Sequence, residues 1–409
     1  MNKKEVAEIK RRLKKESCTI TRMVGCYVNS SKDKVCTISE SFLNLQDEEF
    51  HKYLELASKT LSGTIGNNLI ELEFPLEAEA IGAPQQTLMA LKESKLEDEN
   101  LCNAFFDHII ETYDYVGNYL ILLYYDNYDV MVKTSDNRAL DESEETYEYV
   151  ICSICPVILS KPGLGYREDE HRIGARIRDW VVGPTDSGFI FPCFTDRSSD
   201  IHSIMMYSKK ADNPHKELWE IGLGCPAKLT AKEKQNAFTN ILTSALGPDK
   251  EDTSDIIVDI QSNLNDYIDK KQEAVSEDDA IILDTEAINT ILEDTLVSEE
   301  KAEKIAKKYD EFFQEAMPQA EEILDPKILK NNELRLEKKS LQEKVSDLTN
   351  KLKESGLVDN DGKDNDIVLK VNPDKVEEIT TTFLDGKKCI IIPIDNGEKA
   401  TINGMMQDI

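Results

Sequence analysis

Residues 119–133 have the sequence YLILLYYDNYDVMVK, and residues 147–159 have the sequence YEYVICSICPVIL. Both stretches are rich in β-branched and aromatic residues, and the second alternates in the way that strands do. Asp126 and Asn127 interrupt the first stretch, so we expect two strands, 119–125 and 128–133, joined as a hairpin around them. Together the two stretches predict that an antiparallel sheet forms the centre of the fold.

Further elements are predicted on both sides of this centre. Short strands separated by glycine, proline and serine are expected at 18–27, 34–41, 71–74, 180–182, 189–194 and 201–207. Helices are expected at 2–16, 46–61, 87–95 and 99–113, and from Thr230, which forms a capping box with Glu233, to about Leu246. The prediction is an α+β domain over residues 1–248, with a mainly antiparallel sheet core and flanking helices.

The chain then becomes strongly acidic. Residues 249–325 contain 24 acidic and 7 basic residues, with helical periodicity at 286–295 and 299–317. We therefore expect residues 249–326 to form an acidic helical region that is solvated rather than packed into a compact core.

Residues 327–354 predict a helix with a short coiled coil. Leucines recur every seven residues at 334, 341 and 348, and Lys338, Val345 and Leu352 occupy the second heptad phase. A polar linker is expected at 355–366. Strands at 367–371, 380–384 and 388–393, with a turn at Asp385-Gly386, predict a small β-rich C-terminal unit over residues 367–409.

Charge narrows the possible functions. The 409 residues carry a formal net charge of −30, although residues 1–34 contain ten lysines and arginines against four acidic residues. So negative a surface disfavours binding to membranes and makes nucleic acid an unlikely partner. The exception is the basic helix at 3–15, which could contact nucleic acid. We expect this helix to dock on the protein's own acidic helices instead. Nine irregularly spaced cysteines and the lack of a signal sequence or a spanning run predict a cytoplasmic protein.

Cys152 and Cys155 form the one CxxC motif of the sequence. Such a pair can be a redox dithiol or half of a zinc site. In a regular strand, however, positions i and i+3 face opposite sides, so the two sulfurs would diverge. We expect a structural role for both, and neither a metal site nor a cofactor.

Five of the ten arginines lie between residues 167 and 197, among acidic residues. Arginine forks bind phosphate or carboxylate, so Arg172, Arg176, Arg178 and Arg197 are candidate anion-binding residues. Candidate acid–base residues beside them are Asp196, Asp200 and His202. Arg172, Arg176 and Asp179 would share one face if their segment were helical. The alternative, which we favour, is that these arginines form internal ion pairs that hold loops on the sheet.

Three segments resemble one family: ICSICPVILSKPGLGY from residue 151, RIGARIRDWVVG from residue 172 and FIFPCFTDRSSDIHS from residue 189. With residues 1–27, they look like the family catalogued as domain of unknown function 4317. The resemblance covers most of the chain. It implies a bacterial cytoplasmic protein, mainly from anaerobic Gram-positive species, and it implies no activity, cofactor or catalytic residue.

We expect a non-enzymatic interaction protein, which binds a protein partner or self-associates through residues 331–352. The alternatives are an enzyme or binding protein for a phosphorylated or other anionic ligand that uses the arginine cluster, and a nucleic-acid-associated protein that uses the basic N-terminal segment.

Overall fold

The computed structural model describes residues 1–133, 139–247, 250–272, 281–293, 295, 297–314, 316–354, 373–393, 400–402 and 405–407. These residues form two compact units, Met1–Leu329 and Lys330–Ile409.

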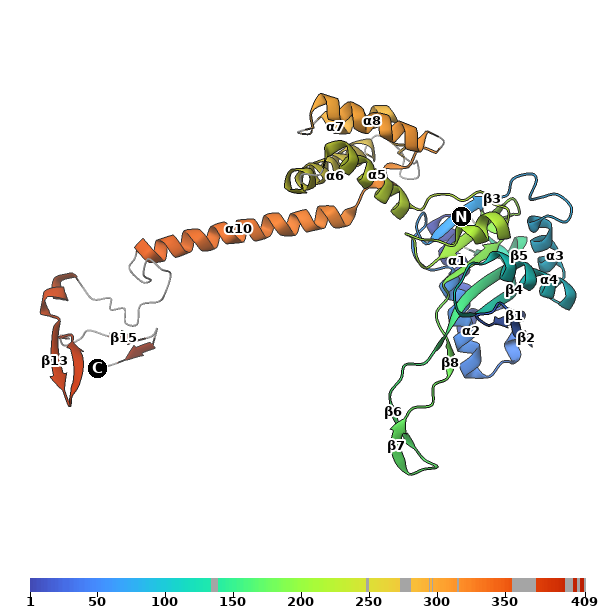
Figure 1. Ribbon diagram of the computed structural model, residues 1–409, viewed down its shortest axis with the longest axis horizontal. Coiled ribbons are helices and arrows are strands. Elements are labelled where there is room, and N and C mark those ends of the chain that lie inside the picture. The colour runs from blue at the N-terminus through green and yellow to red at the C-terminus, as the bar shows by residue number, and fades with distance from the viewer. Residues whose placement is uncertain are drawn as a thin grey trace. The chain divides into compact units, whose positions relative to one another are not determined.

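The first unit is built on one large antiparallel sheet with the strand order β2-β1-β4-β5-β9-β12-β3 (Figure 1). Its strands are β1 (Arg22–Val28), β2 (Lys34–Ser41), β3 (Leu69–Glu73), β4 (Asn118–Lys133), β5 (Ala139–Leu159), β9 (Ser187–Phe191) and β12 (Ser203–Ser208). A short strand, β8 (Trp180–Val182), pairs with the end of β5. Helices flank this sheet, so the predicted α+β class is confirmed.

The expected hairpin at Asp126-Asn127 is wrong, because these residues lie within the single long strand β4. Asp126 stands opposite Tyr149 of β5 in the strand register. Its buried carboxylate accepts hydrogen bonds from the Tyr149 hydroxyl at 2.5 Å and from the Asn127 backbone N–H at 2.9 Å. A cross-strand partner that satisfies the carboxylate thus overrides the local turn preference of Asp-Asn.

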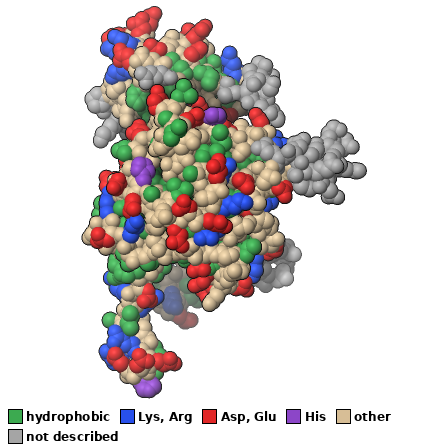
Figure 2. Space-filling model, turned by 90° about the vertical axis from the view of Figure 1, so that its right-hand side faces the viewer, with side chains coloured by type: hydrophobic (Ala, Val, Ile, Leu, Met, Phe, Trp, Pro, Cys, Tyr) green, Lys and Arg blue, Asp and Glu red, His purple; other side chains and the backbone are tan. Residues whose placement is uncertain are grey.

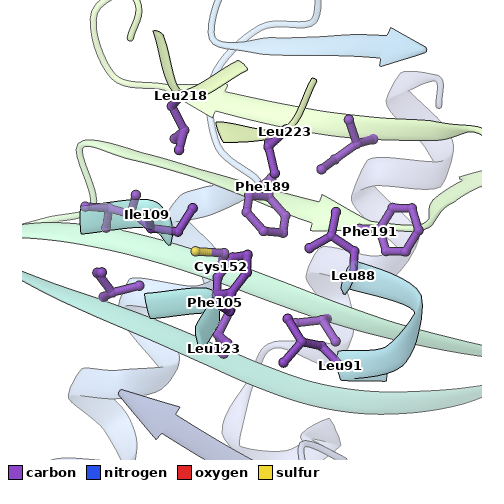
Figure 3. Packing of buried hydrophobic residues seen from close by; sticks show 14 of the residues in the cluster. Leu88, Leu91, Phe105, Ile109, Leu123, Cys152, Phe189, Phe191, Leu218 and Leu223 are labelled. Carbon is purple, nitrogen blue, oxygen red and sulfur yellow. The ribbon is translucent and has the colours of Figure 1, made fainter. Parts of the chain in front are cut away.

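Helices cover both faces of the sheet. One face packs against α3 (Pro84–Glu93) and α4 (Glu99–Thr112), and Figure 3 shows Leu88, Leu91 and Phe105 of these helices against the strands. The other face packs against α1 (Lys3–Arg12) and α2 (Asp47–Thr60). Residues of β4 alternate between the two clusters, with Ile121 in the first and Leu122 in the second.

Helix α1 was expected to dock on acidic helices. Its apolar residues Val6 and Ile9 pack instead into the cluster on the sheet, because burying them there removes apolar surface from water. Just after α1, Lys15 does form an ion pair with an acidic residue of a helix: its Nζ lies 3.3 Å from Asp47, the first residue of α2.

The single strand expected at 189–194 is divided in two. Pro192, which has no N–H to donate to a ladder, separates β9 from β10 (Cys193–Thr195). Strand β10 pairs with β11 (Ser198–Asp200) in a separate two-stranded sheet.

The sequence predicted that the acidic helical region is solvated rather than packed. This prediction is wrong, because the region has a buried core. Its helices are α6 (Lys250–Gln272), α7 (Thr285–Glu293), α8 (Glu299–Phe313) and α9 (Ala320–Ile323), and they share a buried cluster with α5 (Ala231–Leu246). Ile260, Ile288 and Ile305 are buried in it. These helices are amphipathic: their acidic residues occupy the outer positions, and their apolar positions meet in a core.

Helix α10 (Pro326–Glu354) contains the predicted heptad segment, and its Leu334, Leu341 and Leu348 side chains are exposed. The second unit also contains β13 (Thr380–Leu384) paired with β14 (Lys387–Ile391), and β15 (Ala400–Ile402) paired with β16 (Met405–Gln407). Asp385 and Gly386 adopt positive φ angles of 49° and 76°, which confirms the predicted turn. The expected linker at 355–366 and strand at 367–371 lie outside the described residues.

The helical core gives a direct prediction. Ile288→Ala removes a side chain that is 1% exposed, so we expect it to lower the free energy of unfolding by about 2–5 kcal/mol. The matched change Ile282→Ala affects a side chain that is 50% exposed and should cost about 1 kcal/mol or less. Urea denaturation followed by circular dichroism measures both. Equal, small losses would show that the acidic helices lack a packed core.

Candidate functional site

The paired end of β5 and β8 forms the base of an extension. We define the extension as residues 158–182, and it projects from the body of the first unit (Figure 1). Its outer part is a hairpin of β6 (Leu164–Arg167) and β7 (Arg172–Ala175), with Leu164 opposite Ala175. Residues 172–175 are therefore a strand, and the helical face considered for Arg172, Arg176 and Asp179 does not form.

Hydrogen bonds hold the two sides of the extension together. Near its base, the Ser160 N–H donates to the Asp179 carbonyl at 2.8 Å, and Arg178 Nε donates to the Ser160 carbonyl at 2.6 Å. Further out, the Arg176 N–H donates to the Gly163 carbonyl at 2.8 Å, and Arg167 Nη2 donates to the Ala175 carbonyl at 2.9 Å. The side chains of Arg167 and Arg178 thus brace the segment that carries them, together with the backbone N–H of Arg176.

The tip of the extension carries an ion-pair group. Glu170 accepts from Arg167 Nη1 at 2.7 Å and also from Arg172 Nε. Tyr166 Oη lies 3.2 Å from His171 Nδ1. The side chains of Arg172 and Glu170 are 58% and 44% exposed, so water screens this group.

Large apolar side chains also stand exposed on the extension. The eight that are exposed are Ile158, Leu164, Tyr166, Ile173, Ile177, Trp180, Val181 and Val182. Seen from the side in Figure 2, the extension protrudes from the body, with basic and acidic side chains around its tip. Exposed Tyr, Trp and Arg beside aliphatic side chains are typical of protein-binding surfaces.

Arg197 lies away from the extension. It occupies the β10–β11 turn with Asp196, at positive φ angles of 63° and 51°. Arg197 Nη1 lies 3.3 Å from Glu8 of α1, and Tyr128 donates its hydroxyl to Glu8 at 2.6 Å. Because the Asp196 N–H also donates to Glu5, this turn is tied to α1. The structure thus places Arg197 on a different element from Arg172, Arg176 and Arg178.

The candidate acid–base residues have separate partners. Asp200 accepts from the His202 backbone N–H at 3.0 Å. His202 Nδ1 lies 2.6 Å from Glu79, and this contact raises the pKa of an imidazole that is 66% exposed. Asp196 engages α1 through its backbone. Their proposed chemical role remains a prediction.

Cys152 and Cys155 lie in strand β5 and face opposite sides of the sheet, as expected from their spacing. Burial raises the pKa of both thiols, that of Cys155 to about 12. Within the part of the chain that the structure describes, no group of three or more His, Cys, Asp or Glu side chains is arranged to hold a metal ion. A search of the same residues for a helix long and apolar enough to cross a membrane also finds none.

One half-buried group was not singled out by the sequence patterns. His215 Nδ1 lies 2.7 Å from Glu217, and His215 Nε2 lies 3.5 Å from Asp186, while the ring centroid is 4.6 Å from that of Tyr113. Burial alone lowers the pKa of His215, but the hydrogen bonds to Asp186 and Glu217 outweigh it, so the net shift is upward. The hydrogen bond to His215 in turn lowers the pKa of Asp186. Asp186 and Tyr113 are distant from His215 in sequence, so no local motif predicts this group.

The comparison with protein families agrees with the resemblance of the motifs. The family described as domain of unknown function (DUF4317) matches residues 1–405. The chain belongs to this family. No curated protein matches the chain. The family description assigns no activity.

The ion pair of Arg172 is more exposed than that of Arg197, so truncation of the two side chains should affect stability unequally. Arg172→Ala removes an exposed ion pair and should change the free energy of unfolding by about 0–1 kcal/mol. Arg197→Ala removes a pair whose two side chains are only 28% and 18% exposed, and should cost about 1.5–3 kcal/mol. Thermal melts of both variants test this difference. A larger loss for Arg172 would contradict the assignment.

The His215 group predicts a pH dependence. A raised folded-state pKa contributes stability that is complete below the unfolded value and is lost as pH rises through the folded value. The stability difference between wild type and His215→Gln should therefore be largest near about pH 6 and smaller near about pH 9. Urea unfolding at a series of pH values measures it, with His51→Gln, an exposed histidine, as control. A difference that does not vary with pH would refute a charged His215.

Proposed function

We propose that this chain is a non-enzymatic interaction protein and that the extension is its docking element. The supporting observation is the group of eight exposed apolar side chains in 25 residues. Single exposed apolar residues are ordinary, but here Tyr166 stands opposite Ile173 and Ile158 opposite Val181, and neighbouring exposed apolar side chains mark interaction sites. Trp180, Tyr166 and the arginines are residue types that dominate binding energy when a partner buries them.

The partner that we assign to the extension is a second copy of this chain. The extension contains five basic and four acidic residues, whereas the whole chain has a net charge of −30. The surface outside the extension is therefore strongly acidic. This acidic surface of one copy would attract Arg176 and Arg178 of another copy, whereas two such acidic surfaces would repel each other. The extension is also a place where two copies can approach with little electrostatic repulsion.

Helix α10 gives a second argument for self-association. Leu334, Leu341 and Leu348 recur every seven residues and are all more than half exposed. A second helix that packs on this seam would bury them, as in a short coiled coil. Association through α10 would also raise the effective concentration of one extension near another copy. A cytoplasmic location fits this proposal, since the nine cysteines are free thiols.

Sedimentation velocity over a concentration series tests the proposal. We expect the wild-type chain to self-associate, and Ile173→Ser with Ile177→Ser to weaken association by about tenfold or more. The matched control is Ile81→Ser with Ile221→Ser, which changes two exposed isoleucines outside the extension and should leave association unchanged. Leu341→Ser with Leu348→Ser tests α10 in the same way.

Two results would contradict the proposal. A wild-type chain that stays monomeric up to about 100 µM would exclude a second copy as the partner. Equal effects of the extension variant and its control would show that general surface hydrophobicity, rather than the extension, drives association.

A further inference from the structure

A hollow lies between residues 10–15, at and just after the end of α1, and one side of α2. Its volume is about 450 Å³, and it is lined by Lys10, Leu13, Lys14, Lys15, His51, Leu54, Glu55, Ser58, Lys59 and Ser62. It is separate from the extension and shares no residue with it.

Packing of the two segments explains why lysines line this hollow. Leu13 and Leu54 are both 4% exposed and belong to the cluster that covers the sheet. They close the bottom of the hollow with apolar surface. The lysines lie on the outer sides of the same segments, where their ammonium groups can reach water.

The charges in the hollow are largely uncompensated. It contains four lysines and one carboxylate, Glu55, and Glu55 already lies 3.2 Å from Lys52 Nζ. Lys15 pairs with Asp47, whose side chain is 86% exposed. Among the described residues, no carboxylate lies within 4.0 Å of the ammonium groups of Lys10, Lys14 or Lys59. A concentration of unpaired cations is unexpected in a chain with a net charge of −30.

The chemistry of the lining points to phosphate. Lysine ammonium groups act as point charges toward phosphate oxygens, and the Ser58 hydroxyl and the His51 imidazole can add hydrogen bonds. Ser62 donates its hydroxyl to the Lys59 carbonyl at 2.6 Å, which ties this end of α2 together. The volume is in the range of sites for small molecules, which is about 300–1,000 Å³.

We propose that this hollow binds a small molecule that carries two or more phosphate groups. A single phosphate would leave part of the cationic lining unused, because the hollow has four lysines, three from residues 10–15 and one, Lys59, from α2. A chain of phosphates can contact lysines of both segments. The apolar bottom formed by Leu13 and Leu54 can accept the uncharged part of such a ligand.

Isothermal titration calorimetry of the full chain with inorganic tripolyphosphate and with adenosine triphosphate tests the proposal. We expect binding at low salt that weakens as salt rises, because the contacts are partly exposed. The triple change Lys10→Gln, Lys14→Gln and Lys59→Gln should weaken binding by about tenfold or more.

The matched control is Lys3→Gln, Lys4→Gln and Lys307→Gln, which alters the net charge equally at exposed positions outside the hollow. It should change the affinity by less than about threefold. Circular dichroism and thermal melts establish that both triple variants are folded.

Three results would overturn the proposal. The first is no binding of tripolyphosphate by the wild-type chain at low salt. The second is equal weakening by both triple variants, which would show an effect of net charge alone. The third is tighter binding of duplex DNA, or of vesicles containing phosphatidylglycerol, than of either small phosphate, which would assign the lysines to a macromolecular surface.

Discussion

Burial of strands β4 and β5 on both faces is the constraint on which the rest of the structure depends. Neighbouring residues of β4, such as Ile121 and Leu122, belong to different buried clusters, so both faces must be covered by helices. Helices α3 and α4 provide one cover, and α1 and α2 provide the other. The same constraint excludes convergence of Cys152 and Cys155, because residues three apart in a regular strand cannot share a face.

Close packing also limits which residues the centre of the sheet accepts. A Cβ atom added at Gly188 would lie 2.2 Å from the Cys152 carbonyl oxygen, so β9 can approach β5 only with glycine there. Asp126 is tolerated in the buried sheet because Tyr149 donates a hydroxyl proton to it. Burial raises the pKa of Asp126 most strongly, against the opposing effects of Tyr149, Thr19 and Arg12. The Asp126 carboxyl group can therefore be buried in the sheet because its hydrogen-bond partners compensate for the loss of water.

Local patterns predicted most elements, since helix caps and strand alternation are short-range signals. The capping box of Thr230 and Glu233 begins α5 as expected, and β2 and β8 have the expected bounds. The strand expected at 189–194 was misjudged locally, because Pro192 divides it. Other errors occurred where a distant partner decided the structure. Asp126 lies in a strand because Tyr149 is its cross-strand partner. The apolar faces of α7 and α8 pack in one core although the region is strongly acidic. The contact of His215 with Asp186 likewise depends on the folded chain.

The distribution of arginine and lysine separates architecture from candidate binding. Arginine is concentrated in sequence at 167–178, but its fixed fork is used there to brace the extension, through the carbonyls of Ala175 and Ser160 and through Glu170. Lys10, Lys14 and Lys15 belong to the basic N-terminal segment that is evident in the sequence, and folding places Lys59 of α2 beside them in one hollow. A flexible ammonium group satisfies fewer fixed acceptors than a guanidinium does, so it is more readily left available to a ligand. In this chain the arginine cluster therefore braces the segment that carries it, whereas the lysines that line the hollow are the side chains available to hold an anion.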